Sequence, residues 1–128
     1  MPASDPDPER ARGAGETGVS LRREGSAVVL TARGEFDVLT TPQLQAAVRE
    51  ALHDQNPPDV LVIDLTAVRF FASIALSALA EARQAAGEHT TLRLAVEHSL
   101  DRTLRLVGLD QQFALYSSAA EALAAEET

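Results

Sequence analysis

Residues 59–86 constrain the fold most, because an apolar segment there leads through a short connection into an alanine-rich amphipathic segment. The apolar segment, 59–65, contains Val60, Val62 and Ile63, and such a run is typical of a strand buried on both faces of a sheet. Residues 73–86 predict a helix that Gly87 ends. A strand followed by a helix of this length favours parallel strand pairing, since the helix carries the chain back across the sheet.

Strand and helix patterns alternate along the rest of the chain. Residues 19–24 and 27–34 predict an edge hairpin with the turn Gly25-Ser26, in which alternate apolar residues of the second strand share one face. Thr40 or Thr41 is expected to cap a helix that Asn56-Pro57-Pro58 ends. Strands are predicted at 91–96 and 113–116, with a helix between them from near Ser99 to Gly108. Ser117 or Ser118 is expected to cap a last helix, with Glu121 placed for a capping box.

The element order ββαβαβαβα predicts an α/β fold: a single-layer mixed, mostly parallel β-sheet with helices packed on it. We expect residues 18–128 to form this domain and residues 1–17, with three prolines and many charges, to form a disordered tail. Ligands and partners of such folds tend to meet loops at the carboxyl ends of strands. Two predicted loops qualify, residues 34–42 and 65–73.

Composition excludes several function classes. With 19 acidic and 11 basic residues the net charge is −8, which argues against binding nucleic acid or an anionic membrane surface. There is no cysteine, and the histidines fit no metal template, so we expect no metal and no cofactor. No convergent acid, base or nucleophile is evident, so we expect no catalytic activity. Neither a membrane-spanning run nor a signal peptide is evident, and cytoplasmic residence is expected. The three histidines, expected on the surface, are His53, His89 and His98.

Three sequence segments together resemble a STAS domain, the fold of bacterial anti-sigma-factor antagonists. GEFDVLTTPQL at 34–44 is similar to the family's G-E-[LIV]-D followed by a threonine and a helix. VIDLTAVRFF at 62–71 is similar to the family's apolar strand and D-L-[ST]. LRLVGL at 104–109, with Phe113 beyond it, is similar to the third helix and final strand of the family. The three segments occur in the order and at the spacing found in the family. The resemblance extends over essentially all of the predicted domain.

The family's functional motif, D-S-[ST]-G-L, reads Ala72-Ser73-Ile74-Ala75-Leu76 in this chain. The resemblance implies a partner, an anti-sigma factor with a serine-kinase-like ATPase fold, whose capture frees a sigma factor. It also implies that the partner phosphorylates the second hydroxyl position, which Ile74 occupies here. Phosphorylation would add negative charge to the interface and break the complex. Because isoleucine has no hydroxyl, we expect this control to be lost.

Three interpretations of the altered motif remain open. The first, which we favour, is an antagonist that binds constitutively and uses Ile74 as an apolar contact. The second is a degenerate module whose partner is not a kinase. The third moves phosphorylation to Ser73 or Ser77. A different function, a STAS subunit that senses a ligand or serves as a scaffold in a transport or stress-signalling complex, is the alternative.

The residues expected to bind the partner are Asp37, Thr40, Ala72, Ser73, Ile74, Ala75 and Ser77. Several of them also have simpler structural interpretations. Ser73 is expected to cap its helix rather than to carry phosphate. Ile74 is either a core residue or an exposed contact, and Asp37 either meets a partner or bonds its own turn. Asp64 is expected to hydrogen-bond the loop after its strand, and Phe70 and Phe71 to pack in the core or against that loop.

Overall fold

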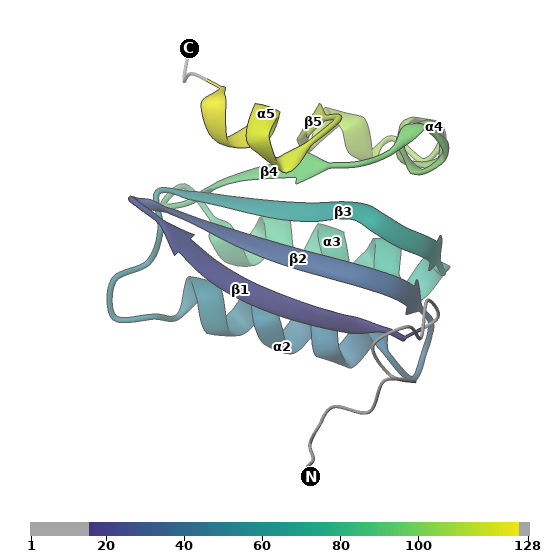
Figure 1. Cartoon of the computed structure of the whole chain (residues 1–128), viewed down its shortest axis with the longest axis horizontal. Coiled ribbons are helices and arrows are strands. Elements are labelled where there is room, and N and C mark those ends of the chain that lie inside the picture. Colours follow the sequence, from purple (N-terminus) through teal and green to yellow (C-terminus); the bar gives the residue numbers. More distant parts are fainter. Residues whose placement is uncertain (1–15, 126–128) are drawn as a thin grey trace, which may run out of the picture.

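The computed structural model describes residues 16–125, whose five strands form one sheet in the order β1-β2-β3-β4-β5 (Figure 1). β1 (Gly18–Glu24) pairs antiparallel with β2 (Ala27–Phe36), and every later pair is parallel. The later strands are β3 (Val60–Phe71), β4 (Thr91–Ala95) and β5 (Ala114–Tyr116). The predicted mixed, mostly parallel sheet is confirmed. The tail expected at 1–17 lies outside the described residues, apart from its last two.

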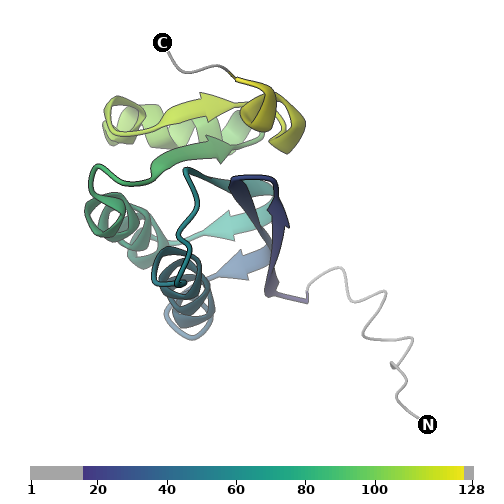
Figure 2. The same cartoon turned by 90° about the vertical axis from the view of Figure 1, so that its left-hand side faces the viewer.

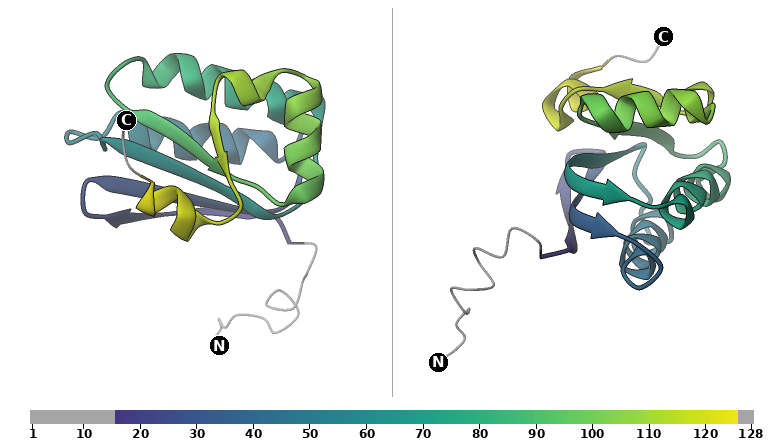
Figure 3. Two further views of the ribbon diagram at one scale, coloured as in Figure 1. Left: turned by 90° about the horizontal axis from the view of Figure 1, so that it is seen from above. Right: turned by 90° about the vertical axis from the view of Figure 1, so that its right-hand side faces the viewer.

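Helices cover both faces of this sheet unequally. α2 (Thr41–Leu52) and α3 (Ser73–Ala86) lie side by side on one face, and the short α5 (Ala119–Ala124) lies on the other (Figures 2 and 3). α4 (His98–Leu106) and the 3₁₀ turn η1 (Leu109–Gln111) connect β4 to β5. The predicted order of strands and helices is therefore confirmed, with η1 as an additional element.

The main hydrophobic core lies between the sheet and α2, α3 and α4. Leu30, Ile63 and Leu79 are fully buried in it. Four alanines of α3 face this core, and their small side chains let the helix lie close to the sheet: Ala75, Ala78, Ala82 and Ala86. On the opposite face a smaller cluster joins Val29 and Val62 to Ala122 of α5. The middle of β3 is thus buried on both faces, as predicted.

β3 is longer than its sequence pattern predicts. It continues past Leu65 to Phe71 and stays paired with β2, with Ala67 opposite Arg33 and Phe71 opposite Phe36. Most of the loop expected at 65–73 is therefore strand, and this prediction is wrong. The pairing of β2 with β3 shifts register twice, between Thr31 and Arg33 and between Gly34 and Glu35 of β2. β3 has one extra residue at each place, and these bulges break its regular alternation of side chains.

The ends of the later helices show which side chains cap them. The carboxylate of Glu97 accepts from the backbone N–H of Ser99 at 2.8 Å, so α4 begins with an acidic cap, two residues before the predicted start near Ser99. Ser118 caps α5 by accepting from the Glu121 backbone N–H at 3.0 Å. The Glu121 carboxylate in turn accepts from the backbone N–H of Ser117 at 3.1 Å. The predicted capping arrangement is confirmed, with Ser118 as the cap.

Candidate functional site

Two segments that carry predicted site residues meet at the carboxyl ends of β2 and β3. Phe36 and Phe71, the last residues of these strands, lie opposite each other in the parallel register. Just beyond them, the backbone N–H of Ala72 donates to the carbonyl oxygen of Phe36 at 2.9 Å. The turn at 37–40 and the start of α3 therefore emerge together from one edge of the sheet.

The turn at 37–40 is held by the side chains of Asp37 and Thr40. Asp37 Oδ1 accepts from the backbone N–H of Leu39 at 2.9 Å and of Thr40 at 3.1 Å. The Thr40 hydroxyl accepts from the Asp37 backbone N–H at 2.9 Å and lies 2.8 Å from the Glu35 carbonyl oxygen and 3.0 Å from Asp37 Oδ1. The bonds from the Thr40 hydroxyl, then those from the two backbone N–H groups, lower the pKa of Asp37. Asp37 thus bonds its own turn, as one of its two interpretations predicts.

Neither threonine at the start of α2 caps the helix with its hydroxyl. Thr40 is at the N-cap position but makes no side-chain cap bond, because its hydroxyl is engaged in the preceding turn. Thr41 is the first helical residue, and its fully buried hydroxyl oxygen has no hydrogen-bond partner among residues 16–125. The expected threonine cap is therefore wrong, and the fixed φ of Pro42 supports the first turn instead.

Ser73 does not cap α3, contrary to the prediction. The N-cap is Ala72, whose methyl group cannot accept a hydrogen bond, and no side chain in the described part of the chain caps this helix. Ser73 is the first helical residue and is exposed, and its hydroxyl bonds no other residue of the described part of the chain. The start of α3 therefore presents an unengaged hydroxyl group to solvent.

The other predicted residues of α3 divide between surface and core. Ile74 is 41% exposed, so the choice between core residue and exposed contact is settled in favour of exposure. Ser77 is exposed and Ala72 is partly buried. Ala75 is fully buried against the core, because it starts the alanine stripe of α3, and the expectation that its side chain meets a partner is wrong.

Three exposed apolar residues at the same edge were not identified from the sequence as site residues. Val38 and Leu39 are 65% and 81% exposed in the turn, and Phe70 is 52% exposed near the end of β3. With Ile74 these residues form what we call the apolar edge. The sequence contains a signal for this edge, because Val38 and Leu39 are adjacent apolar residues within a turn. Phe70 was expected in the core or against the loop after β3, and it is exposed instead. Phe71 packs inward, with its ring 6.0 Å from that of Phe36.

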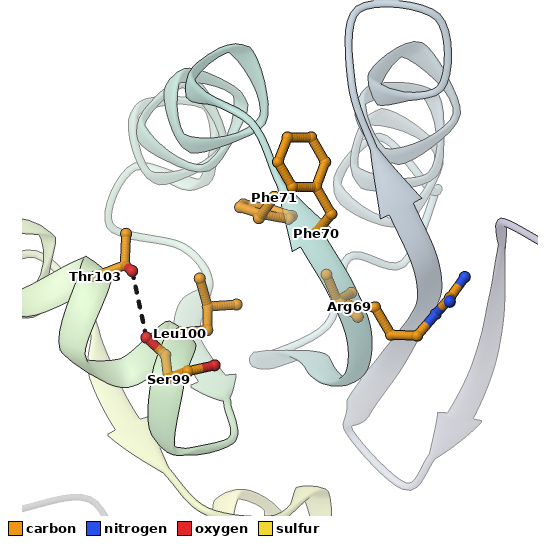
Figure 4. A pocket seen from close by; sticks show the side chains of 7 residues that line it. Arg69, Phe70, Phe71, Ser99, Leu100 and Thr103 are labelled. Carbon is orange, nitrogen blue, oxygen red and sulfur yellow. Dashed lines mark hydrogen bonds between the residues drawn. The ribbon is translucent and has the colours of Figure 1, made fainter. Parts of the chain in front are cut away.

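A pocket of about 210 Å³ lies beside the apolar edge, between the end of β3 and α4 (Figure 4). Its lining mixes apolar groups such as Leu100 with the polar residues Arg69, Ser99 and Thr103. The Thr103 hydroxyl donates to the Ser99 carbonyl oxygen at 3.3 Å, across the first turn of α4. Between residues 16 and 125, no group of histidine and acidic side chains is placed to hold a metal ion.

Asp64 lies within β3, and the three histidines lie on separate elements of the fold. Asp64 accepts from both the backbone N–H and the hydroxyl of Thr66, at 3.0 and 2.7 Å, and this bond lies within the extended β3 rather than in a loop. The three histidines are exposed and separate, as expected.

Comparison with known proteins agrees with this fold. The family model described as "Mlab, STAS domain" matches residues 19–117. The chain belongs to the STAS domain family. A curated STAS relative from Mycobacterium tuberculosis, the anti-sigma-F factor antagonist RsfB, is 34% identical over 106 residues, which is 82% of this chain and 85% of RsfB.

Solved STAS structures share the architecture. The crystal structure of an anti-sigma factor antagonist from Mycobacterium paratuberculosis matches with a TM-score of 0.78 and 31% identity, covering 84% of this chain and 92% of that one. Bacillus SpoIIAA in its phosphorylated form matches with a TM-score of 0.64 and 15% identity, covering 83% and 96% of the two chains, and this likeness concerns the fold alone. Within residues 16–125 no helix is long and apolar enough to cross a membrane.

Proposed function

We propose that this chain is an anti-sigma-factor antagonist, which binds a serine-kinase-type anti-sigma factor and thereby frees a sigma factor. The observation that carries the proposal is the 34% identity, over 82% of the chain, to a protein named as an anti-sigma-F factor antagonist. The architecture of the site supports a binding role without catalysis, since the edge presents apolar side chains and the neighbouring carboxylate of Asp37 is engaged in its own turn.

The apolar edge supplies the binding surface in this proposal. Ile74, Phe70, Val38 and Leu39 are exposed large apolar residues, and their burial against a partner is favourable by about 25 cal/mol for each Å² removed from water. The hydrogen bonds of the 37–40 turn and the bond from Ala72 to Phe36 hold the surface in shape before binding. A preformed surface loses little conformational entropy on association.

Two forms of control fit this surface, and they differ in whether the Ser73 hydroxyl is phosphorylated. In the first, the absence of a hydroxyl at Ile74 leaves binding constitutive. In the second, the kinase acts on Ser73, whose exposed hydroxyl is free of the capping bond that we expected it to make. A phosphate on Ser73 would stand next to Ile74, where its charge would oppose burial of the apolar edge. The observation that favours the second form is the unengaged Ser73 hydroxyl.

Release of a sigma factor tests the function directly. The anti-sigma factors encoded in the same genome are purified, and each is mixed with its sigma factor and RNA polymerase in a transcription assay. Adding this chain should restore transcription for one of these pairs. A chain that binds none of the anti-sigma factors and restores no transcription would contradict the proposal. Specific binding to subunits of a transport complex would instead support the scaffold function.

The two forms of control separate in a phosphorylation assay with the same anti-sigma factor and ATP. Intact-mass measurement reports whether the chain gains a phosphate, and Ser73→Ala and Ser77→Ala identify the acceptor. Constitutive binding predicts no phosphate and a complex that survives ATP. Control through Ser73 predicts one phosphate, lost in Ser73→Ala but kept in Ser77→Ala, together with dissociation of the wild-type complex.

A further inference from the structure

We propose that Val38 and Leu39 form a rigid apolar finger that inserts into an apolar recess of the protein partner, bordered by basic side chains. This inference rests on the proposed function, because the partner is the anti-sigma factor that also contacts Ile74. It adds to the turn that carries the expected contacts Asp37 and Thr40 two apolar residues that neither the family motif at 72–76 nor the comparisons assign to a contact.

The two side chains of the finger are unusually exposed for apolar residues. Leu39 and Val38 are 81% and 65% exposed, which makes both more accessible than Ile74 on α3. Neither side chain belongs to a hydrophobic cluster formed by residues 16–125. The fold therefore gains nothing from an apolar residue at either position, and neighbouring exposed apolar residues on a folded surface are typical of contact sites.

Hydrogen bonds within the turn fix the direction of the finger. Asp37 Oδ1 accepts from the backbone N–H groups of Leu39 and Thr40, and the Asp37 carbonyl oxygen accepts from the backbone N–H of Thr41 at 2.9 Å. The Thr40 hydroxyl ties the turn back to the Glu35 carbonyl oxygen at 2.8 Å. Because the backbone is already ordered, inserting the two side chains costs mainly their own rotamer entropy.

The position of the finger makes it continuous with the contact at Ile74. Its base, Phe36, accepts the hydrogen bond from Ala72, and Ala72 is the N-cap of the helix that carries Ile74. A single protein surface laid on this edge can therefore cover both. Separate attachment through two elements would also explain how binding is specified when the family motif at 72–76 is altered.

Charge indicates the class of occupant. The finger is flanked by the carboxylates of Asp37 and of Glu35, the latter 3.6 Å from the Arg69 guanidinium, and the whole chain carries a net charge of −8. An anionic lipid surface would be repelled, and a second copy of this acidic chain would bring like charges together. A partner with an apolar recess and a basic border is complementary to both features, and such pairing speeds association in a salt-dependent manner.

A matched pair of variants tests the finger. Leu39→Ser removes the tip of the finger, and Leu106→Ser removes a leucine of equal exposure, 82%, at the end of α4. Affinity for the anti-sigma factor is measured by isothermal titration calorimetry with the full chain. We expect Leu39→Ser to weaken binding at least about tenfold, Val38→Ser to weaken it less, and Leu106→Ser to change it less than about twofold.

The outcomes separate this inference from the proposed function. If Leu39→Ser binds like the wild type while Ile74→Glu does not, the finger is overturned and the antagonist function stands. If the wild-type chain binds no anti-sigma factor, the proposed function fails first. Sedimentation with vesicles of phosphatidylcholine and phosphatidylglycerol, and size-exclusion chromatography, test the other occupants. Vesicle binding or self-association that Leu39→Ser abolishes would overturn the assignment to a protein partner.

Discussion

The backbone N–H of Ala72 donates to the carbonyl oxygen of Phe36, 2.9 Å away, and this bond joins the two segments that form the apolar edge. It extends the parallel pairing of β2 and β3 by one residue beyond Phe71. As a result, the 37–40 turn and the start of α3 are fixed relative to each other by backbone atoms, independently of the identity of their side chains. Substitutions on the edge can therefore alter contact chemistry while leaving the scaffold in place.

Gly34 is predicted to be required for the close approach of β2 to the backbone at Thr17. Its φ is +95°, and a Cβ there would lie 2.7 Å from the Cα of Thr17. Gly25 also has a positive φ, +62°, but a Cβ there would meet nothing within 4 Å. Gly34→Ala should therefore cost more stability than Gly25→Ala, which carries a backbone penalty of only about 1–2 kcal/mol. Urea denaturation compares the two, and equal losses would contradict the steric explanation.

Asp37→Asn is predicted to remove a pH-dependent part of the stability. The hydroxyl of Thr40 and the backbone N–H groups of Leu39 and Thr40 hold the pKa of Asp37 below its ordinary value of 3.8. Since the folded-state pKa is the lower one, the contribution is present above about pH 4 and disappears as the pH falls through the folded-state pKa.

The free energy of unfolding, measured in urea from pH 7 to pH 3, checks this prediction. Asparagine retains the acceptor oxygen but not the charge, so the turn should keep its conformation. The difference in stability between wild type and Asp37→Asn should be largest at neutral pH and shrink on the acid side. A difference that stays constant across this range would show that ionisation of Asp37 contributes nothing to folding.

Ile74→Ser combined with Ala75→Gly rebuilds the family motif and is predicted to make residue 74 a substrate of the cognate kinase. Ala75 is buried in the first turn of α3, so its replacement by glycine should cost roughly 1 kcal/mol of stability. Ile74→Ser alone is the control that keeps this helix intact. Phosphate is located by mass spectrometry in a Ser73→Ala background. A rebuilt chain that binds the kinase but is never modified would contradict the assigned partner.

Arg93→Met is predicted to loosen α5. Arg93 is buried in β4, and its guanidinium donates to the Ala122 carbonyl oxygen at 2.8 Å, across the smaller hydrophobic cluster. Loss of a buried hydrogen bond from a charged group costs about 1.5–3 kcal/mol. Hydrogen exchange of α5 should accelerate in the variant while α2 and α3 remain protected. Unchanged exchange in α5 would show that packing alone holds it.

Much of the fold was predictable because its local signals agree with its tertiary structure. Gly25-Ser26 marks the hairpin turn, and Gly87 and Gly108, both with positive φ, follow the ends of α3 and α4. The length of β3 was not predictable from its pattern. Its final residues are ordered by pairing with β2, and the irregular register around Gly34 removes the alternation that identifies a strand.

The candidate site was predictable in position but not in detail. The altered motif at 72–76 located the edge, and the exposure of Ile74 agrees with one of its two interpretations. The capping roles expected for Ser73 and Thr40 were wrong. Both are residue types that often cap helices, but Ser73 is the first helical residue of α3 and the Thr40 hydroxyl makes no cap bond. Which of two neighbouring residues becomes the N-cap depends on where the preceding strand ends, and sequence patterns locate that point poorly.

The affinity of Ile74→Glu for the anti-sigma factor, measured beside Leu106→Glu, tests the central claim most directly. Both variants replace an exposed apolar side chain by a carboxylate, and circular dichroism should show both folded. The claim that the apolar edge binds the partner predicts that Ile74→Glu weakens binding at least about tenfold, roughly 1.4 kcal/mol, while Leu106→Glu does not. Wild-type affinity in Ile74→Glu would contradict it.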